Sequence, residues 1–115
     1  MILTIKKLEK CFGGIKAVHD CDFDVKENTI VALIGPNGAG KTTVFNLLTG
    51  FVQPDKGHMH YKGTPLIGKK PHQIANLGIT RTFQLIKLLP KLTLTENLLI
   101  AKHLSGEHLF NIIFK

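Results

Sequence analysis

The chain has 115 residues, of which 43% are hydrophobic and 20% charged, with a formal net charge of +7. This length fits one domain with a buried core, and the composition excludes a disordered chain. No apolar run reaches the 18 or so residues of a membrane span, and the N-terminus lacks the apolar centre of a signal peptide, so we expect a soluble cytoplasmic protein.

The positive charge suits an anionic partner. The lysines are scattered, however, and the longest basic runs are the pairs Lys6-Lys7 and Lys69-Lys70. Nucleic-acid binding favours a dense basic block or interleaved aromatic residues. We therefore expect no nucleic-acid partner and interpret the lysines as a solvated surface.

The first 25 residues predict an antiparallel hairpin. Residues 2–9 alternate apolar and polar side chains, Phe12-Gly13-Gly14 is a turn signal, and residues 15–25 form a second strand. Cys11 and Cys21 flank this turn, so they could face each other across the hairpin. The expected compartment favours two reduced, buried thiols, and there is no C-x-x-C metal spacing.

The strongest signal lies within residues 29–50. Gly35-Pro36-Asn37-Gly38-Ala39-Gly40-Lys41-Thr42 matches the phosphate-binding pattern G-x-x-x-x-G-K-[ST]. Residues 29–34 before it predict a short buried strand. Apolar residues at helical spacing after it predict a helix, which Gly50 ends in a left-handed cap. The order of strand, glycine loop and helix is what this motif requires.

The residue types of the loop explain the chemistry. Its glycines allow positive φ and bring bare N–H groups close to a phosphate, where the helix N-terminus adds positive charge. Lys41 is placed to reach the β- and γ-phosphates, and the Thr42 hydroxyl to ligate Mg²⁺. The alternative is a chance glycine-rich turn.

The downstream half predicts shorter elements. Pro54-Asp55-Lys56-Gly57 is a turn, and residues 58–61 form a strand. Pro71 opens a helix that Gly78 ends, residues 79–83 form another strand with Gln84 at its end, and residues 85–92 form an apolar loop. Thr93 and Glu96 form a capping-box pattern that starts a helix running through Lys102.

Two further patterns are weaker. His58 and His60 share one strand face, so either a metal pair or two exposed histidines would fit, and no third ligand lies nearby. The apolar residues 108–115 have no later element to cover them, so we expect the chain to stop within a domain.

The flanking motifs, taken in order, resemble the ATP-binding subunits of ABC transporters, most closely the LivG type that serves branched-chain amino acid uptake. They are Phe12-Gly13-Gly14-Ile15-Lys16-Ala17-Val18, the loop GPNGAGKTT, Pro54-Asp55-x-Gly57, Arg81-Thr82-Phe83-Gln84 and Leu94-Thr95-Glu96-Asn97-Leu98. The resemblance implies an α/β fold: the N-terminal half of a P-loop ABC ATPase core, with a small antiparallel β region and the start of an α-helical subdomain.

The resemblance also implies roles for single residues. Phe12 matches the aromatic residue that stacks on adenine, Val18 the apolar residue beside the ribose, and residues 35–43, including Thr43, the phosphate loop. Gln84 matches the glutamine that contacts Mg²⁺ and the attacking water and senses the membrane subunit. Without the resemblance, Phe12 reads as a core residue beside a turn and Gln84 as a polar strand end.

The family's signature sequence, Walker B aspartate, catalytic glutamate and switch histidine would all follow Gln84, beyond Lys115. Leu104-Ser105-Gly106-Glu107 is too close to Gln84 to be the signature, and the second glycine and the glutamine are missing. We therefore expect residues 1–115 to be part of a nucleotide-binding domain that binds Mg²⁺-ATP weakly and does not hydrolyse it alone.

The intact protein is expected to be an ATPase that drives transport from the inner face of the membrane. The resemblance implies permease subunits, a second ATP-binding subunit and, indirectly, a substrate-binding protein as partners. Three alternatives remain: a non-catalytic nucleotide-binding remnant or interaction module, an ABC-type ATPase outside transport, and a small P-loop kinase. The kinase would need additional arginines, and Arg81 is the only one in the sequence.

Overall fold

The computed structural model describes residues 1–82 and 89–101. The chain divides into two units, Met1–Thr80 and Arg81–Lys115, which are treated separately below. No helix within the described ranges is long and apolar enough to cross a membrane.

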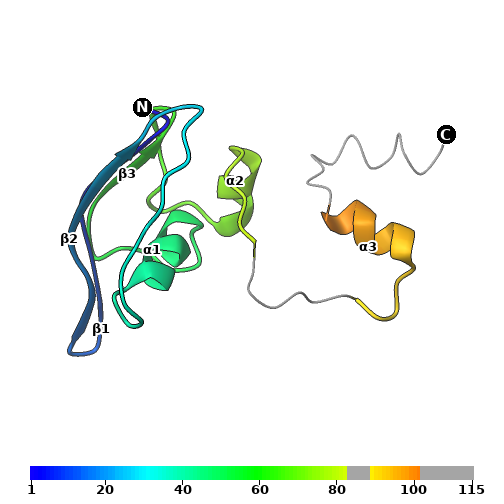
Figure 1. The fold of residues 1–115 in the computed structure, drawn as a ribbon, viewed down its shortest axis with the longest axis horizontal. Coiled ribbons are helices and arrows are strands. Elements are labelled where there is room, and N and C mark those ends of the chain that lie inside the picture. The colour runs from blue at the N-terminus through cyan, green and yellow to red at the C-terminus, as the bar shows by residue number, and fades with distance from the viewer. Residues whose placement is uncertain (83–88, 102–115) are drawn as a thin grey trace. The chain divides into compact units, whose positions relative to one another are not determined.

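The first unit is built on a four-stranded antiparallel sheet (Figure 1). Its strands are β1 (Leu3–Phe12), β2 (Ile15–Val25), β3 (Lys56–Tyr61) and β4 (Thr64–Pro65), in the spatial order β2-β1-β3-β4. The predicted hairpin is confirmed, because β1 and β2 pair antiparallel across the turn that Gly13 makes with a φ of 57°. The strand predicted at residues 58–61 is β3, which begins two residues earlier.

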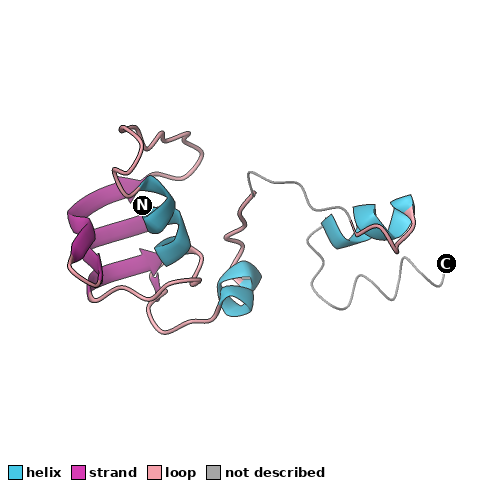
Figure 2. Ribbon diagram, turned by 90° about the horizontal axis from the view of Figure 1, so that it is seen from below, coloured by secondary structure: helices cyan, strands magenta, loops and turns pink. Residues whose placement is uncertain are grey.

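Two short helices complete the first unit. Helix α1 (Lys41–Leu48) lies across one face of the sheet (Figure 2). It ends before Gly50, whose φ of 76° is the predicted left-handed cap. Helix α2 (Pro71–Asn76) starts at its proline and ends before Gly78, which has a φ of 102°, as the sequence predicts.

The core lies between the sheet and the helices. Ile5 and Leu8 of β1 are fully buried although they are three residues apart, because the pairing of β1 with both neighbours shifts between them. Such a bulge returns the alternation of side chains to the same face. The nine buried hydrophobic side chains are Ile5, Leu8, Val18, Val44, Leu47, Leu48, Met59, Leu66 and Ile74.

The cysteines do not face each other, so that expectation was wrong. Because Phe12 pairs with Ile15 at the turn, Cys11 lies opposite Lys16, whereas Cys21 lies further along β2 and pairs with Leu8. Both thiols are free, but Cys11 is exposed and Cys21 only half-buried, so their expected burial was also wrong. Partial burial, together with the neighbouring Asp22 carboxylate, raises the pKa of Cys21.

The strand predicted at residues 29–34 does not form. This stretch lies outside every strand, and Ile30, Val31 and Ile34 are exposed. A strand requires a neighbour to receive its hydrogen bonds, and none of the described strands pairs with this stretch. Residues 79–82 likewise form no strand; the remainder of that prediction, Phe83 and Gln84, lies outside the described residues.

The described part of the second unit contains α3 (Leu94–Ala101). Its predicted capping box is confirmed: Thr93 N–H donates to Glu96 Oε2 over 2.7 Å, and Glu96 N–H donates to Thr93 Oγ1 over 3.3 Å. The Thr93 N–H, and after it the Thr93 hydroxyl, which donates to the same Oε2 over 2.8 Å, lower the pKa of Glu96. The predictions for Lys102, residues 104–107 and residues 108–115 lie outside the described residues.

Candidate functional site

The glycine loop before α1 adopts the conformation that its sequence predicts. Gly38 and Gly40 have φ angles of 84° and 85°, and Ala39 N–H donates to Pro36 O over 3.2 Å. A Cβ on Gly40 would lie 2.1 Å from the carbonyl oxygen of Ala17 in β2. Only glycine permits both this φ and this approach, so the loop rests directly against the hairpin.

Lys41 folds back over the loop from the first position of α1. Its Nζ donates to the carbonyl oxygens of Gly35 and Pro36, each over 2.6 Å. Hydrogen bonds from a charged donor are short and comparatively strong. The ammonium group is therefore held at the loop rather than extended into solvent.

The electrostatics of the helix start favour an anion. The first turn of α1 carries no acidic residue and Gly40 provides no side-chain cap, so the helix dipole is not neutralised by a carboxylate. The Thr42 side chain is exposed and Thr43 is half-buried, whereas Asn37 and Ala39 are exposed in the loop. These residues fit a phosphate group: a cation, a helix N-terminus and backbone N–H groups with little side-chain bulk around them.

The two residues expected to hold the nucleoside differ in their surroundings. The side chain of Phe12, at the end of β1, is 48% exposed, and Lys10 Nζ lies 5.5 Å from its ring centroid. Val18 is 6% exposed, with its Cγ2 3.6 Å from a Cβ placed on Gly40. Phe12 thus offers an open aromatic surface, while Val18 packs in the core beside the loop. Gln84, the third candidate outside the loop, lies among the residues that the structure does not describe.

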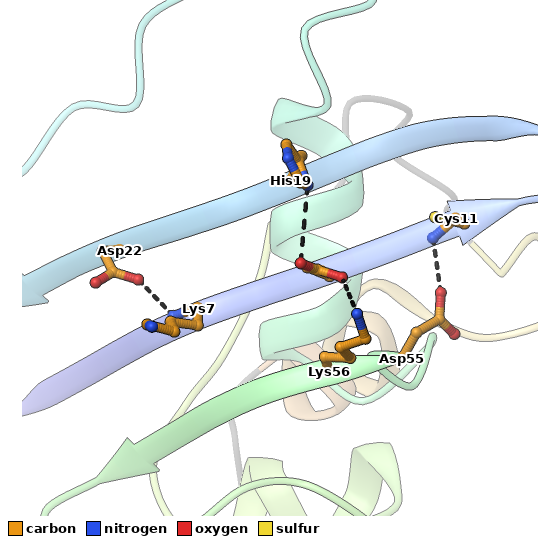
Figure 3. A network of polar contacts seen from close by, with 7 residues as sticks. Lys7, Cys11, His19, Asp22, Asp55 and Lys56 are labelled. Carbon is orange, nitrogen blue, oxygen red and sulfur yellow. Dashed lines mark hydrogen bonds and ion pairs between the residues drawn. The ribbon is translucent and has the colours of Figure 1, made fainter.

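A second polar cluster covers the sheet face opposite α1 (Figure 3). Glu9 pairs with Lys56 over 3.1 Å and with His19 over 3.8 Å, and Lys7 N–H donates to Asp22. A hollow of about 770 Å³ opens here. Glu9 and Lys56 form an ion pair here, and an exposed pair of this kind contributes little energy.

The histidine pair does not form a metal site in the structure. His58 is exposed and His60 half-buried on β3. Within the ranges that the structure describes, no group of three His, Cys, Asp or Glu side chains could hold a metal ion. Two partly exposed histidines, the other reading of this pattern, agree with these positions.

No sequence pattern predicts a role for Lys10 or Asp55 in the site. Asp55 lies in the predicted turn, but its carboxylate also contacts β1: Oδ1 accepts from Lys10 Nζ over 2.8 Å and Oδ2 from Cys11 N–H over 2.7 Å. Lys10 and Cys11 each lie more than 40 residues from Asp55 in the sequence. No local pattern predicts such a contact, although an acidic residue in a turn beside a strand end is the signal available.

Known proteins share this loop and fold. The "probable branched-chain amino acid transport ATP-binding protein LivG" of Archaeoglobus fulgidus is 43% identical over 112 residues, which are 97% of this chain and 44% of that protein. The chain therefore spans less than half the length of this relative.

Solved structures of ABC transporter cassettes also match this chain. The crystal structure of the ADP conformation of an ATP-binding cassette of an ABC transporter matches with a TM-score of 0.78 and 34% identity, over 99% of this chain and 45% of that one. A dimeric bacterial ABC transporter cassette matches with a TM-score of 0.73 and 27% identity, over 92% of this chain and 51% of that one. Residues 18–113 match the sequence model of the ABC transporter family. The chain belongs to the ABC transporter family and has the fold of the N-terminal part of its P-loop ATPase cassette.

Proposed function

We propose that this chain binds Mg²⁺-ATP, with the phosphates held by residues 35–43. The observation that carries the proposal is the position of Lys41, whose Nζ lies 2.6 Å from two carbonyl oxygens of the glycine loop. An ammonium group, a helix N-terminus and bare backbone N–H groups converge there, and phosphate is the ligand that all three attract.

Each of these residues contacts a different part of the ligand. Lys41 compensates the charge of the β- and γ-phosphates, the Thr42 hydroxyl ligates Mg²⁺, and Phe12 stacks on the adenine ring. Val18 borders the ribose from the core side. Thr42 and Gln84 would hold the Mg²⁺ ion, which when bound would supply positive charge beside the phosphates, and Gln84 would also contact the attacking water.

The intact subunit is proposed to hydrolyse ATP and to drive import of branched-chain amino acids. The name of the LivG relative, a branched-chain amino acid transport ATP-binding protein, supports this substrate class. Residues 1–115 would be the part of the nucleotide-binding domain that carries the phosphate loop. The partners of the intact subunit would be permease subunits at the inner face of the membrane, a second ATP-binding subunit and, indirectly, a substrate-binding protein. The dimeric cassette among its structural relatives supports the pairing of two such subunits.

The test is ATP binding by the 115-residue chain, measured by calorimetry with Mg²⁺. Because a hydrogen bond to a charged group contributes about 1.5–3 kcal/mol, we expect Lys41→Ala to weaken binding by about 10- to 100-fold. Lys26→Ala is the matched control, since it removes the same charge from an exposed position away from the loop. Equal affinities of the two variants would refute the proposed site.

The transport role needs a separate experiment. Copurification of the intact subunit with a permease would support it, and its recovery with a nucleic acid instead would favour an ABC-type ATPase outside transport. ATP binding by an intact subunit that neither hydrolyses ATP nor associates with a permease would identify a non-catalytic remnant.

A further inference from the structure

The turn between α1 and β3 is attached to the end of β1 by one side chain and one backbone group of Asp55. Its carboxylate accepts from Cys11 N–H over 2.7 Å and from Lys10 Nζ over 2.8 Å (Figure 3 shows the Cys11 bond). The Asp55 N–H donates to the carbonyl oxygen of Glu9 over 2.9 Å. Three consecutive residues are thus held immediately before Phe12.

These bonds lie where the hairpin itself is irregular. The pairing of β1 with β2 shifts between Leu8 and Lys10 and again between Lys10 and Cys11. A shifted ladder leaves backbone groups without their regular partners. The pairing of β1 with β3 also ends at Glu9–Lys56, so the Cys11 amide lies beyond that strand, and Asp55 supplies its partner.

Lys10 extends the contact to the aromatic ring. Its Nζ binds Asp55 and lies 5.5 Å from the centroid of Phe12, within the range of a cation–π interaction. The Lys10 side chain is only 16% exposed, whereas Phe12 is 48% exposed. A largely buried, hydrogen-bonded cation therefore rests against the ring and leaves about half of the Phe12 surface open.

We propose that Asp55 is a positioning residue for the nucleobase: it holds Lys10 and the Cys11 amide, and through them fixes the Phe12 ring for stacking on adenine. This inference rests on the proposed function, in which Phe12 contacts the base. The hydrogen bond from Lys10, followed by that from the Cys11 amide, lowers the pKa of Asp55, so the carboxylate stays ionised at neutral pH and keeps both bonds.

Binding of ATP is compared with binding of inorganic triphosphate, which has the phosphates but no base. In Asp55→Asn the Phe12 ring is no longer fixed, and ordering a mobile side chain on binding costs affinity. This variant is therefore expected to weaken ATP binding by about three- to tenfold and to leave triphosphate binding unchanged. Asp24→Asn is the matched control, because it breaks the 3.0 Å Lys6–Asp24 ion pair of the same sheet without touching Phe12 or its neighbours. Equal losses for both ligands would mean that Asp55 only stabilises the fold, and would overturn the proposal.

A second measurement needs no nucleotide. The sequence contains no Trp, so Phe12→Trp places a single indole at this position. In that background Asp55→Asn should lower the fluorescence anisotropy of the indole, and Asp24→Asn should not. Unchanged anisotropy with Asp55→Asn would overturn the positioning role whatever the chain binds.

A different result would refute the stacking of Phe12 on the base, which belongs to the proposed function. If Phe12→Ala leaves ATP binding as tight as in the unaltered chain, Phe12 does not stack on the base, and Asp55 cannot position it for that purpose. If Phe12→Ala weakens ATP binding and Asp55→Asn does not, stacking stands and the positioning role alone is refuted.

Discussion

Gly38 and Gly40 provide a matched pair that separates two reasons for a glycine in the phosphate loop. Their φ angles are nearly equal, 84° and 85°. A Cβ on Gly38 meets nothing within 4 Å, whereas one on Gly40 would lie 2.1 Å from the Ala17 carbonyl oxygen. Alanine at either position therefore has the same backbone strain, and only at position 40 does it also collide with β2.

The two terms can be estimated. A side chain in the left-handed region costs about 1–2 kcal/mol. The obstacle at position 40 is backbone, so the loop or β2 must move by roughly an ångström, and overpacking of this kind costs about 1–3 kcal/mol more. We expect Gly38→Ala to lower the free energy of unfolding by about 1–2 kcal/mol and Gly40→Ala by about 2–5 kcal/mol.

Urea denaturation followed by circular dichroism measures this difference. With a typical slope of about 1–3 kcal/mol per molar for small proteins, the midpoints of the two variants should differ by roughly half a molar or more. Equal midpoints would show that the loop does not rest on Ala17. A lower midpoint for Gly38→Ala than for Gly40→Ala would refute the reasoning altogether.

Two further predictions concern the two units separately. Leu8→Ala removes a fully buried side chain of β1 and should lower the free energy of unfolding by about 2–5 kcal/mol, whereas Ile15→Ala, at a 73% exposed position of β2, should change it by less than about 0.5 kcal/mol. Similar urea midpoints for this pair would contradict the described core. In the second unit, Glu96→Ala should reduce the helix content of α3 at pH 7. Because the folded pKa of Glu96 is lowered, its stabilisation is complete above the unfolded pKa and disappears as the pH falls through the folded value. The circular dichroism of this variant and of the unaltered chain should therefore converge in acid, and a difference that persists there would exclude the Thr93–Glu96 capping box as its cause.

Local patterns predicted the parts of the fold that local interactions form. The hairpin turn, the glycine loop, the cap at Gly50 and the Thr93–Glu96 capping box each depend on residues close to one another in the sequence, at most six positions apart in the bonds of Lys41 to the loop, and all are present. In each case the required backbone angle or hydrogen bond belongs to a particular residue type. The phosphate-loop residues of the candidate site were identified on the same basis.

Predictions that depended on distant partners were wrong or were not made. Residues 29–34 have the apolar, β-branched composition of a strand, but composition does not provide the neighbour that a strand requires. The expectation for Cys11 and Cys21 failed for a different reason, because with Phe12 paired to Ile15 the residue opposite Cys11 is Lys16, five residues before Cys21. The contacts of Asp55 were missed because its partner Cys11 lies on β1, 44 residues earlier in the sequence.

The hairpin links the two ends of the proposed ligand. Phe12 closes β1 on one side of its turn, and Ala17 on the other side supports Gly40 of the phosphate loop. A change that loosens the whole hairpin, such as Leu8→Ala, should therefore weaken ATP and inorganic triphosphate alike. Lys41→Ala removes a phosphate contact, and Asp55→Asn releases only the ring. The ratio of the ATP affinity to the triphosphate affinity thus separates the third kind of damage from the first two: it stays constant when the hairpin loosens or a phosphate contact is lost, and it falls only when Phe12 is no longer held.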